Sequence, residues 1–249
     1  MDPTASPPST EGRARAARDD ADDAAAPLLR AGDRLTRPEF ERRLKAMPSN
    51  KVAKAELVDG LVYMLLSIRA ESHSHPTNTL STWLGVYAAA TPGVRAYTEA
   101  TLRLDLDNGV RPDALLRIED ACGGQSRVTG DDYLSGPPEL VAEVAASSAS
   151  YDLHAKKNVY RRHGVREYLV WQTHEEHLDW FVLEDGAYLR LEPNANGLLQ
   201  SRVFPGLHLD ADALLDDDLA PVIEAARTGT QTDAHAAFTD RRVAAGGGR

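Results

Sequence analysis

Two acidic side chains lie where the sequence predicts buried strands. Asp113 directly precedes a short apolar run, and Glu143 lies inside another, residues 140–145. Both runs have the length and composition of core strands. Burial disfavours an ionised carboxyl group unless a cation or hydrogen bonds compensate. Two acids on neighbouring core strands therefore suggest either a shared metal ion or an ion pair with a nearby lysine.

Lys156 is the candidate cation. It follows Asp152 by four residues and precedes Tyr160 by four, which is the spacing of one helical face. This helix would come directly after the strand that carries Glu143. The three groups together form an acid, acid, lysine set, and the remaining question is what chemistry such a set performs.

Magnesium is the metal that these side chains favour. Mg²⁺ prefers oxygen ligands and is commonly held by one or two carboxylates together with water and phosphate oxygens. A metal in such a site lowers the pKa of bound water and neutralises the charge that develops on a phosphate. An ammonium group within reach can orient the water or stabilise the transition state. The set is therefore suited to phosphodiester hydrolysis with Mg²⁺ or Mn²⁺.

The chain resembles the Uma-type family of restriction endonucleases in the PD-(D/E)XK nuclease superfamily, over roughly residues 36 to 215. The resemblance rests on four segments, residues 55–60, 111–113, 138–144 and 151–171. It implies an α/β (α+β) fold with a restriction-endonuclease-like mixed β-sheet core flanked by helices. It also implies an endonuclease that acts on DNA.

The resemblance further assigns roles to individual residues. It implies that Asp113 and Glu143 bind the metal and that Glu56 is an additional acidic member of the site. One position departs from the superfamily pattern, because Ala145 stands where the motif has its lysine. In the Uma-type family the lysine comes from the following helix, which fits Lys156.

Most of these residues also have a purely structural interpretation. Asp113 follows a proline and could simply begin a strand, and Glu56 could face solvent on a hairpin. Asp152 could be a helix-start residue favoured by the helix dipole, and Lys156 could be a solvated helix lysine. Glu143 has the weakest structural alternative, because an unpaired acid inside an apolar run would cost several kcal/mol. For Tyr160 we expect a role as a core anchor.

A basic strip adjoins the proposed site. Lys157, Arg161 and Arg162 lie within residues 156–166, a stretch of eleven residues without an acid. These side chains could hold a phosphate backbone, or they could form a solvated helix face. The net charge of -10 argues against a general nucleic-acid coat protein, and it predicts weak, salt-sensitive binding of DNA. A homodimer would place two strips on one duplex.

The remaining composition limits the class of protein. The single cysteine, Cys122, excludes an internal disulfide and makes a reducing cytoplasm the simplest location. No stretch approaches the ~20 apolar residues that span a bilayer, so we expect no membrane association. His73 and His75 alternate and could face one way, but without further cysteines they favour the lining of a substrate cleft over a zinc site.

The elements that must position the site can be read from periodicity and turn signals. A helix is expected from Thr36, with a capping box formed with Glu39. The other elements expected are a hairpin at 51–67 turning at 59–60, a helix around 80–87, a hairpin of 97–105 with 111–118, a surface excursion at 119–137, a helix at 151–163, and strands at 165–172, at 177–183 and after 186.

These elements predict one folded domain at residues 36–226. Residues 1–35 and 227–249 are low in large apolar side chains and are expected to lack a fixed fold. The leading functional hypothesis is a Mg-dependent DNA endonuclease. The alternative is a non-catalytic nucleic-acid-binding or regulatory protein on the same scaffold.

Overall fold

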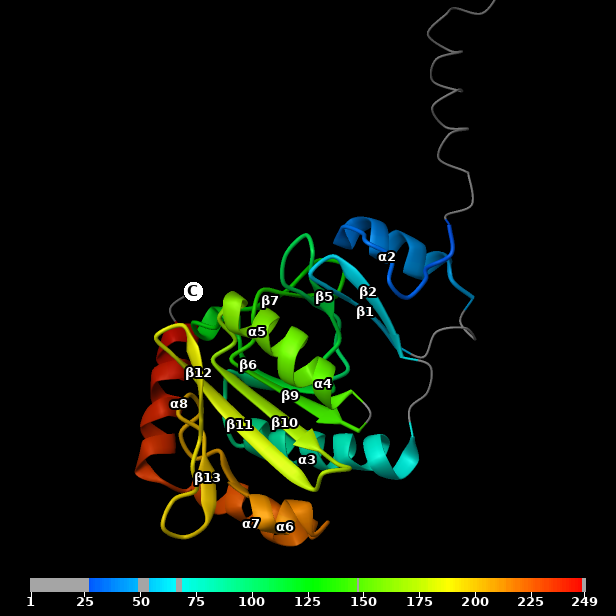
Figure 1. Cartoon of the computed structure of the whole chain (residues 1–249). Helices are drawn as coiled ribbons and strands as arrows, with labels where there is room; N and C mark the ends of the chain where they lie inside the picture. The colour runs from blue at the N-terminus through cyan, green and yellow to red at the C-terminus, as the bar shows by residue number, and fades with distance from the viewer. Residues whose placement is uncertain (1–26, 49–53, 66–68, 147, 248–249) are drawn as a thin grey trace, which may run out of the picture.

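A six-stranded mixed sheet forms the centre of the protein, as the computed structural model in Figure 1 shows. The structure describes residues 27–48, 54–65, 69–146 and 148–247. The strand order is β12-β11-β10-β9-β6-β3. The strands are β3 (Val94–Thr98), β6 (Ala114–Ile118), β9 (Leu140–Ala145), β10 (Glu167–Gln172), β11 (His177–Glu184) and β12 (Ala187–Arg190). The predicted mixed sheet with flanking helices is confirmed.

The strands β9 and β10 are parallel and lie at the middle of this sheet. Every residue of both strands is buried, which is the pattern of strands covered on both faces. A parallel pair needs a crossover connection, and here it is helical. It consists of α4 (Ala149–Tyr151), the π-turn η3 (Asp152–Lys156) and α5 (Lys157–His163). Gly164, with φ +81°, ends the helix where the sequence predicts it.

A second sheet has the order β2-β1-β5-β4-β8-β7. Its first two strands form the predicted hairpin, and Asp59 and Gly60 at its turn both have positive φ, as a two-residue hairpin turn requires. The strands are β1 (Lys54–Val58), β2 (Leu61–Leu65), β4 (Leu102–Arg103), β5 (Gly109–Val110), β7 (Arg127–Val128) and β8 (Leu134–Ser135). Strands β7 and β8 and the short helix η2 (Asp120–Cys122) lie in the predicted excursion.

The hairpin predicted at 97–105 and 111–118 is divided between the two sheets. Its outer part, β3 with β6, belongs to the central sheet, and its inner part, β4 with β5, belongs to the second sheet. Asp113 lies at the junction between them. The amide of Glu99 donates a hydrogen bond of 3.1 Å to the carbonyl oxygen of Asp113 there. The chain thus crosses from the second sheet to the central sheet at Asp113, and this hydrogen bond holds the backbone of Asp113 in place.

One face of the central sheet is covered by α3 (His75–Ala89), which follows the π-turn η1 (Ala70–Ser74). Its predicted apolar face is confirmed, since Trp83 and its helical neighbours are fully buried. The ring of Trp83 meets that of Trp180 edge-on at 5.6 Å. The same hydrophobic cluster includes residues of β13 (Leu198–Gln200), β14 (His208–Asp210), α6 (Ala211–Leu215) and α7 (Leu219–Gly229).

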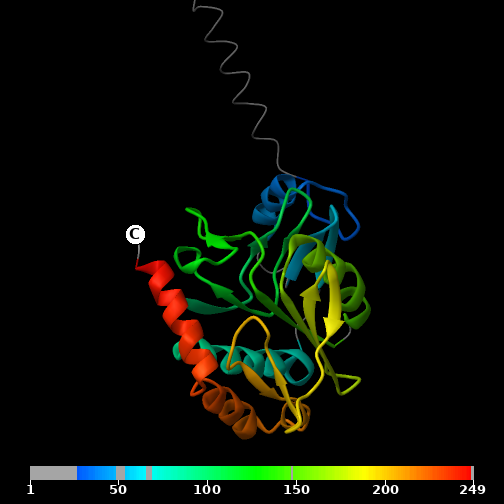
Figure 2. The same ribbon diagram turned by 90° about the vertical axis from the view of Figure 1, so that its left-hand side faces the viewer.

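The prediction that residues 227–249 lack a fixed fold is wrong for residues 227–247, and residues 248–249 lie outside the described residues. Residues 227–247 complete α7 and form α8 (Asp233–Gly246), which runs along one side of the molecule in Figure 2. Phe238 packs edge-on against Phe204, with ring centroids 6.2 Å apart, and His235 packs against Tyr87. The composition of this segment does not predict a docked helix, because the segment is rich in alanine and has few large apolar residues. The two buried side chains of α8, His235 and Phe238, suffice to hold it against the rest of the protein.

Order also begins before the predicted boundary at residue 36. Leu29 is buried in a small cluster with Phe40, and the amide of Gly32 donates to the carbonyl oxygen of Val62 at 2.9 Å. The expectation for residues 1–26 lies outside the described residues. Helix α2 (Arg37–Ala46) begins where predicted, but the capping box is absent at its start. The carboxylate of Glu39 instead accepts hydrogen bonds from the arginines one turn later in the helix.

Within the described part of the chain, no helix has the length and apolar character that crossing a bilayer would need.

Candidate functional site

Asp113 and Glu143 lie side by side on one face of the central sheet. Asp113 stands one residue beyond the last paired position of β6, where Ala114 lies opposite Ala142 of β9. The amide of Val144 donates a hydrogen bond of 2.8 Å to Asp113 Oδ2. Both acids are 1–2 % exposed. The prediction of two acids on neighbouring core strands is therefore confirmed.

Lys156 reaches these acids from the crossover helix. Its Nζ lies 2.5 Å from Glu143 Oε1, 3.2 Å from Glu56 Oε1 and 3.5 Å from Asp152 Oδ1. Only 1 % of Lys156 is exposed, so the alternative of a solvated helix lysine is wrong. Asp152 is buried as well, which makes it more than a helix-start residue.

Glu56 enters the cluster from the second sheet. Side chains alternate along β1, so Glu56 faces the central sheet while Leu57 packs in the cluster around α2. Glu56 Oε1 accepts a hydrogen bond of 2.7 Å from the amide of Arg111, and Oε2 lies 3.4 Å from the Tyr151 hydroxyl. Glu56 is 1 % exposed, so the solvent-facing alternative is wrong.

Lys54 is a member of the cluster that sequence reasoning missed. Its Nζ lies 2.7 Å from Asp113 Oδ1, and the residue is 3 % exposed. It precedes Glu56 by two residues, and residues two apart on a strand share a face. That spacing is the signal that could have identified it once Glu56 was assigned to the site.

His73 and His75 contact different acidic residues. His73 Nε2 lies 3.4 Å from Asp113 Oδ1, whereas His75 Nε2 lies 2.7 Å from Oδ1 of Asp217, which stands between α6 and α7. His73 lines a cavity of about 390 Å³ that also includes Thr77 and Glu99. This cavity adjoins Asp113 through His73, and the expectation that both histidines line a substrate cleft stays a prediction.

Tyr160 is fully buried, as expected for a core anchor, and it also contacts an acid directly. Its hydroxyl donates a hydrogen bond of 2.8 Å to Glu143 Oε1. Burial of the Tyr160 hydroxyl, together with the nearby charge of Glu143, raises the pKa of Tyr160 well above the ordinary value. Tyr160 therefore remains a neutral hydrogen-bond donor that fixes the position of the carboxyl group.

The cluster has more acids than cations. The carboxyl groups of Glu56, Asp113, Glu143 and Asp152 face the ammonium groups of two lysines, so full ionisation leaves two surplus negative charges. Burial, assisted by the charge of Asp113, raises the pKa of Glu143 to about 8 despite the nearby Lys156. Burial also raises the pKa of Asp152.

The other groups of the cluster are held in their charged forms. Burial alone would raise the pKa of Asp113, but the contact with His73 and the charge of Lys54 bring it below its ordinary range. Lys156 is desolvated, yet Glu143 and the other acids raise its pKa well above the ordinary value. Glu143 and Asp152 are thus the carboxyl groups that most readily hold a proton, and a cation bound at Glu143 would displace that proton.

The donor set fits a hard divalent cation. Among the residues that the structure describes, no three His, Cys, Asp or Glu side chains are placed to hold a metal by themselves. Mg²⁺ does not need three, because it commonly uses one or two carboxylates and fills its remaining positions with water and phosphate oxygens. The adjacent carboxylates of Asp113 and Glu143 match that requirement, and the two surplus negative charges of the fully ionised cluster equal the charge of one divalent ion.

The basic strip turns away from this cluster. Lys157 Nζ lies 3.2 Å from the ring centroid of Phe181, and Arg161 donates to the carbonyl oxygen of Gly186. Arg162 is half exposed and pairs with Asp59 on the β1–β2 turn. Adjacent helix positions point about 100° apart, which is why Lys156 and Lys157 face different elements. A role of these side chains in holding DNA remains a prediction.

This protein has a restriction-endonuclease-like fold. Its central mixed sheet brings two carboxylates together, and the neighbouring helix supplies a lysine. The chain belongs to the Uma2 family, described as "Putative restriction endonuclease", which matches residues 38–212. One similar solved structure is that of a "putative nuclease belonging to DUF820" from Anabaena variabilis, with a TM-score of 0.56 and 18 % identity. The match covers 73 % of this chain and 98 % of the other, and at this identity it supports the fold alone. No curated protein matches the chain.

Proposed function

We propose that the protein is a Mg-dependent endonuclease that hydrolyses phosphodiester bonds in DNA. The observation that carries the proposal is the buried convergence of Asp113, Glu143 and Lys156. Membership of a family of restriction endonucleases supports a nuclease function. The metal, the catalytic residues and the choice of DNA go beyond that membership and rest on the chemistry of the cluster.

In this proposal each group has a distinct role. Asp113 and Glu143 hold Mg²⁺ or Mn²⁺, which would polarise the scissile phosphate and lower the pKa of a water molecule. The ammonium group of Lys156 orients the attacking water and offsets negative charge that develops on the phosphate. Glu56 assists by keeping Lys156 charged and in position, through the contact of 3.2 Å. Tyr160 holds the carboxyl group of Glu143 in place.

DNA binding would rely on few contacts, because the protein carries a net charge of -10. We place Lys157, Arg161 and Arg162 beside the phosphate backbone, with Arg162 the most accessible of the three. A homodimer would double the number of such contacts. The molar mass measured by light scattering tests this part of the proposal. The free, buried Cys122 is compatible with a reducing cytoplasm, where we place the protein.

The alternative, a non-catalytic binding or regulatory protein, also has an observation in its favour. Lys54 lies 2.7 Å from Asp113 and Lys156 lies 2.5 Å from Glu143, so both acids already have cationic partners. A closed network of this kind could serve only to join the two sheets. In that case the cluster would bind no metal.

The purified protein with supercoiled plasmid distinguishes the two functions. We expect nicked and linear products with Mg²⁺ or Mn²⁺ and none with a chelator, because the acids need a divalent cation to act on a phosphate. Binding of the plasmid without cleavage in any of these metals would support the non-catalytic alternative.

Metal binding is expected to release about one proton near neutral pH. At pH 7 the carboxyl group of Glu143, whose pKa is raised to about 8, is largely protonated, and a cation would displace that proton. Raising the pH from 6 to 8 removes the competing proton, so the affinity for Mn²⁺ should increase over this range. Calorimetric titration in buffers of different ionisation enthalpy measures the number of protons released. An affinity that is independent of pH would contradict the role of Glu143 as a ligand.

A further inference from the structure

A second cavity, of about 290 Å³, lies between β3 and the excursion that carries β7 and β8. Two tyrosines, Tyr97 and Tyr133, line it together with Asp132 and Val128. We call it the tyrosine pocket. Its size is near the lower end of the range of small-molecule sites, about 300–1,000 Å³. The volume of the pocket and its aromatic and polar lining suit a planar ring that carries polar groups.

The ring of Tyr133 is held in place from outside the pocket. The guanidinium of Arg103 lies 3.9 Å from the ring centroid. Arg103 is itself fixed by ion pairs of 2.8 Å with Glu41 and Asp131. A ring positioned in this way loses little conformational freedom when another ring stacks on it, which is what a stacking platform requires.

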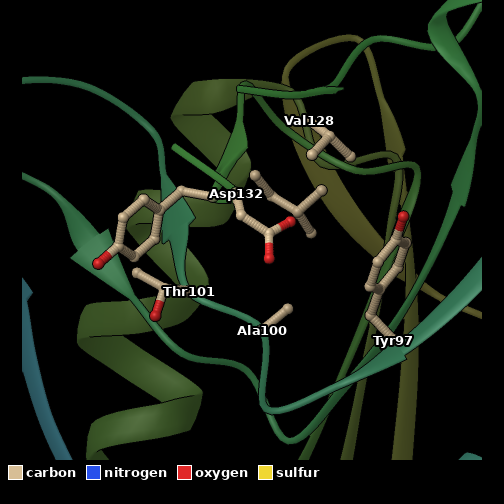
Figure 3. A pocket seen from close by; sticks show the side chains of 7 residues that line it. Tyr97, Ala100, Thr101, Val128 and Asp132 are labelled. Atoms are coloured by element: carbon tan, nitrogen blue, oxygen red, sulfur yellow. The ribbon is translucent and has the colours of Figure 1, made fainter. Parts of the chain in front are cut away.

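An acceptor group stands between the aromatic walls. Figure 3 shows the carboxylate of Asp132 directed into the space between Tyr97 and Thr101. Asp132 has φ +64°, a left-handed conformation that Asp and Asn tolerate better than most residues. Its neighbour Asp131 points instead to Arg103. A carboxylate in this position can accept a hydrogen bond from an amino group, as Asp and Glu do from the amino group of cytosine.

The exposed lining of the pocket includes an apolar side chain. Val128 is 46 % exposed, although it is a large hydrophobic residue. Such a side chain at the mouth of a cavity offers contact area to a ring that enters from solvent.

The pocket shares a wall with the candidate active site. Tyr97 lies opposite Leu115 in the β3–β6 pair, two residues after Asp113. The segment continues through Glu99, whose amide donates to the carbonyl oxygen of Asp113, to Ala100 and Thr101 in the pocket. One short stretch of chain thus borders both the acids and the tyrosines.

We infer that the tyrosine pocket binds one unpaired nucleobase of a single-stranded nucleic acid, stacked on the tyrosines. Asp132 then favours a base with an exocyclic amino group, such as cytosine, over thymine, which has none. The inference rests on the proposed function, because it gives the substrate of the endonuclease an unpaired nucleotide beside the cleavage site.

The test is the affinity of the protein for fluorescent ten-nucleotide oligo(dC) and oligo(dT), measured by anisotropy with a chelator present so that no cleavage occurs. We expect tighter binding of oligo(dC). Tyr97→Ala or Tyr133→Ala should weaken the binding of both oligonucleotides about tenfold, the scale of one lost stacking contact. Asp132→Asn should lower the preference for oligo(dC), because the amide removes the charge and adds a donor that thymine can accept. Asp217→Asn is the matched control, at another exposed aspartate with positive φ, and should keep the preference.

Two further sets of variants separate loss of binding from loss of folding. Tyr97→Phe and Tyr133→Phe keep the rings and should bind as the unaltered protein does. Val128→Asp changes only an exposed rim residue and should weaken binding by placing a negative charge at the mouth. Full affinity in Val128→Asp and in the folded alanine variants would overturn the inference. Normal metal-dependent cleavage by those variants would show that the proposed function survives that result. Conversely, absent cleavage with pocket-dependent binding would sink only the proposed function.

Discussion

Replacing Glu143 with glutamine should reduce plasmid cleavage at least a hundredfold while leaving the fold intact. A glutamine removes a metal ligand and the negative charge that a divalent cation needs, and loss of one such electrostatic group costs about a hundredfold to a thousandfold. The fold should survive because the pKa of Glu143 is raised to about 8, so its neutral form already prevails at pH 7. The amide can still accept the hydrogen bond from Tyr160.

Glu167→Gln is the matched control. Glu167 is fully buried on the neighbouring strand β10, and burial raises its pKa to about 7. Its carboxyl group accepts hydrogen bonds from the Ser201 hydroxyl and the amides of Arg202 and Val203, away from the cluster. This variant should lose stability and keep cleavage per folded molecule. Equal cleavage by Glu143→Gln and the unaltered protein would refute the assigned role of Glu143.

The central acids could be predicted because strand and helix periodicities act over short distances. Burial of an acid inside residues 140–145 required a partner, and Lys156 met that requirement from the next helix. The i, i+4 spacing placed Asp152 and Lys156 on one face, where they lie 3.5 Å apart. These inferences needed only local geometry and the cost of an unpaired buried charge.

The features that escaped prediction depend on contacts distant in the chain. Lys54 meets Asp113 across 59 residues, and the pairing of β1 with β5, the strand that precedes Asp113, brings them together. Helix α8 has few large apolar residues, yet Phe238 docks it on Phe204. Tertiary packing of this kind stabilises most protein helices, and it leaves little trace in local composition.

The basic strip shows that neighbours in the sequence can have different contacts in the fold. Its residues are close in sequence and were expected to act together. The helix directs Lys157 to Phe181 and Arg161 to the β11–β12 turn, while Arg162 reaches Asp59 on the β1–β2 turn. The three side chains therefore contact different elements, and their common role in holding DNA stays a prediction.

Lys156→Met should have the largest combined effect on activity and stability. The change fills much of the same volume but leaves the carboxyl groups of Glu56, Glu143 and Asp152 without their shared cation. Removing one partner from a buried ion pair commonly costs 3–5 kcal/mol, so we expect a loss of about that size in the free energy of unfolding at pH 7. Cleavage per folded molecule should fall roughly a hundredfold or more, because the water and the phosphate lose their ammonium group.

The pH dependence of stability distinguishes this cause from a simple packing defect. Without Lys156 the pKa values of the buried acids rise, so the folded state holds protons that the unfolded state releases above about pH 4.5. The stability of Lys156→Met should therefore fall relative to the unaltered protein as the pH rises from 4.5 to 8, and the difference should shrink in acid. Urea unfolding at several pH values measures it. Lys157→Met, whose ammonium group lies over Phe181, is the control and should change both properties little. Small, equal losses in the two variants, constant with pH, would mean that Lys156 neither holds the acids together nor acts on the substrate.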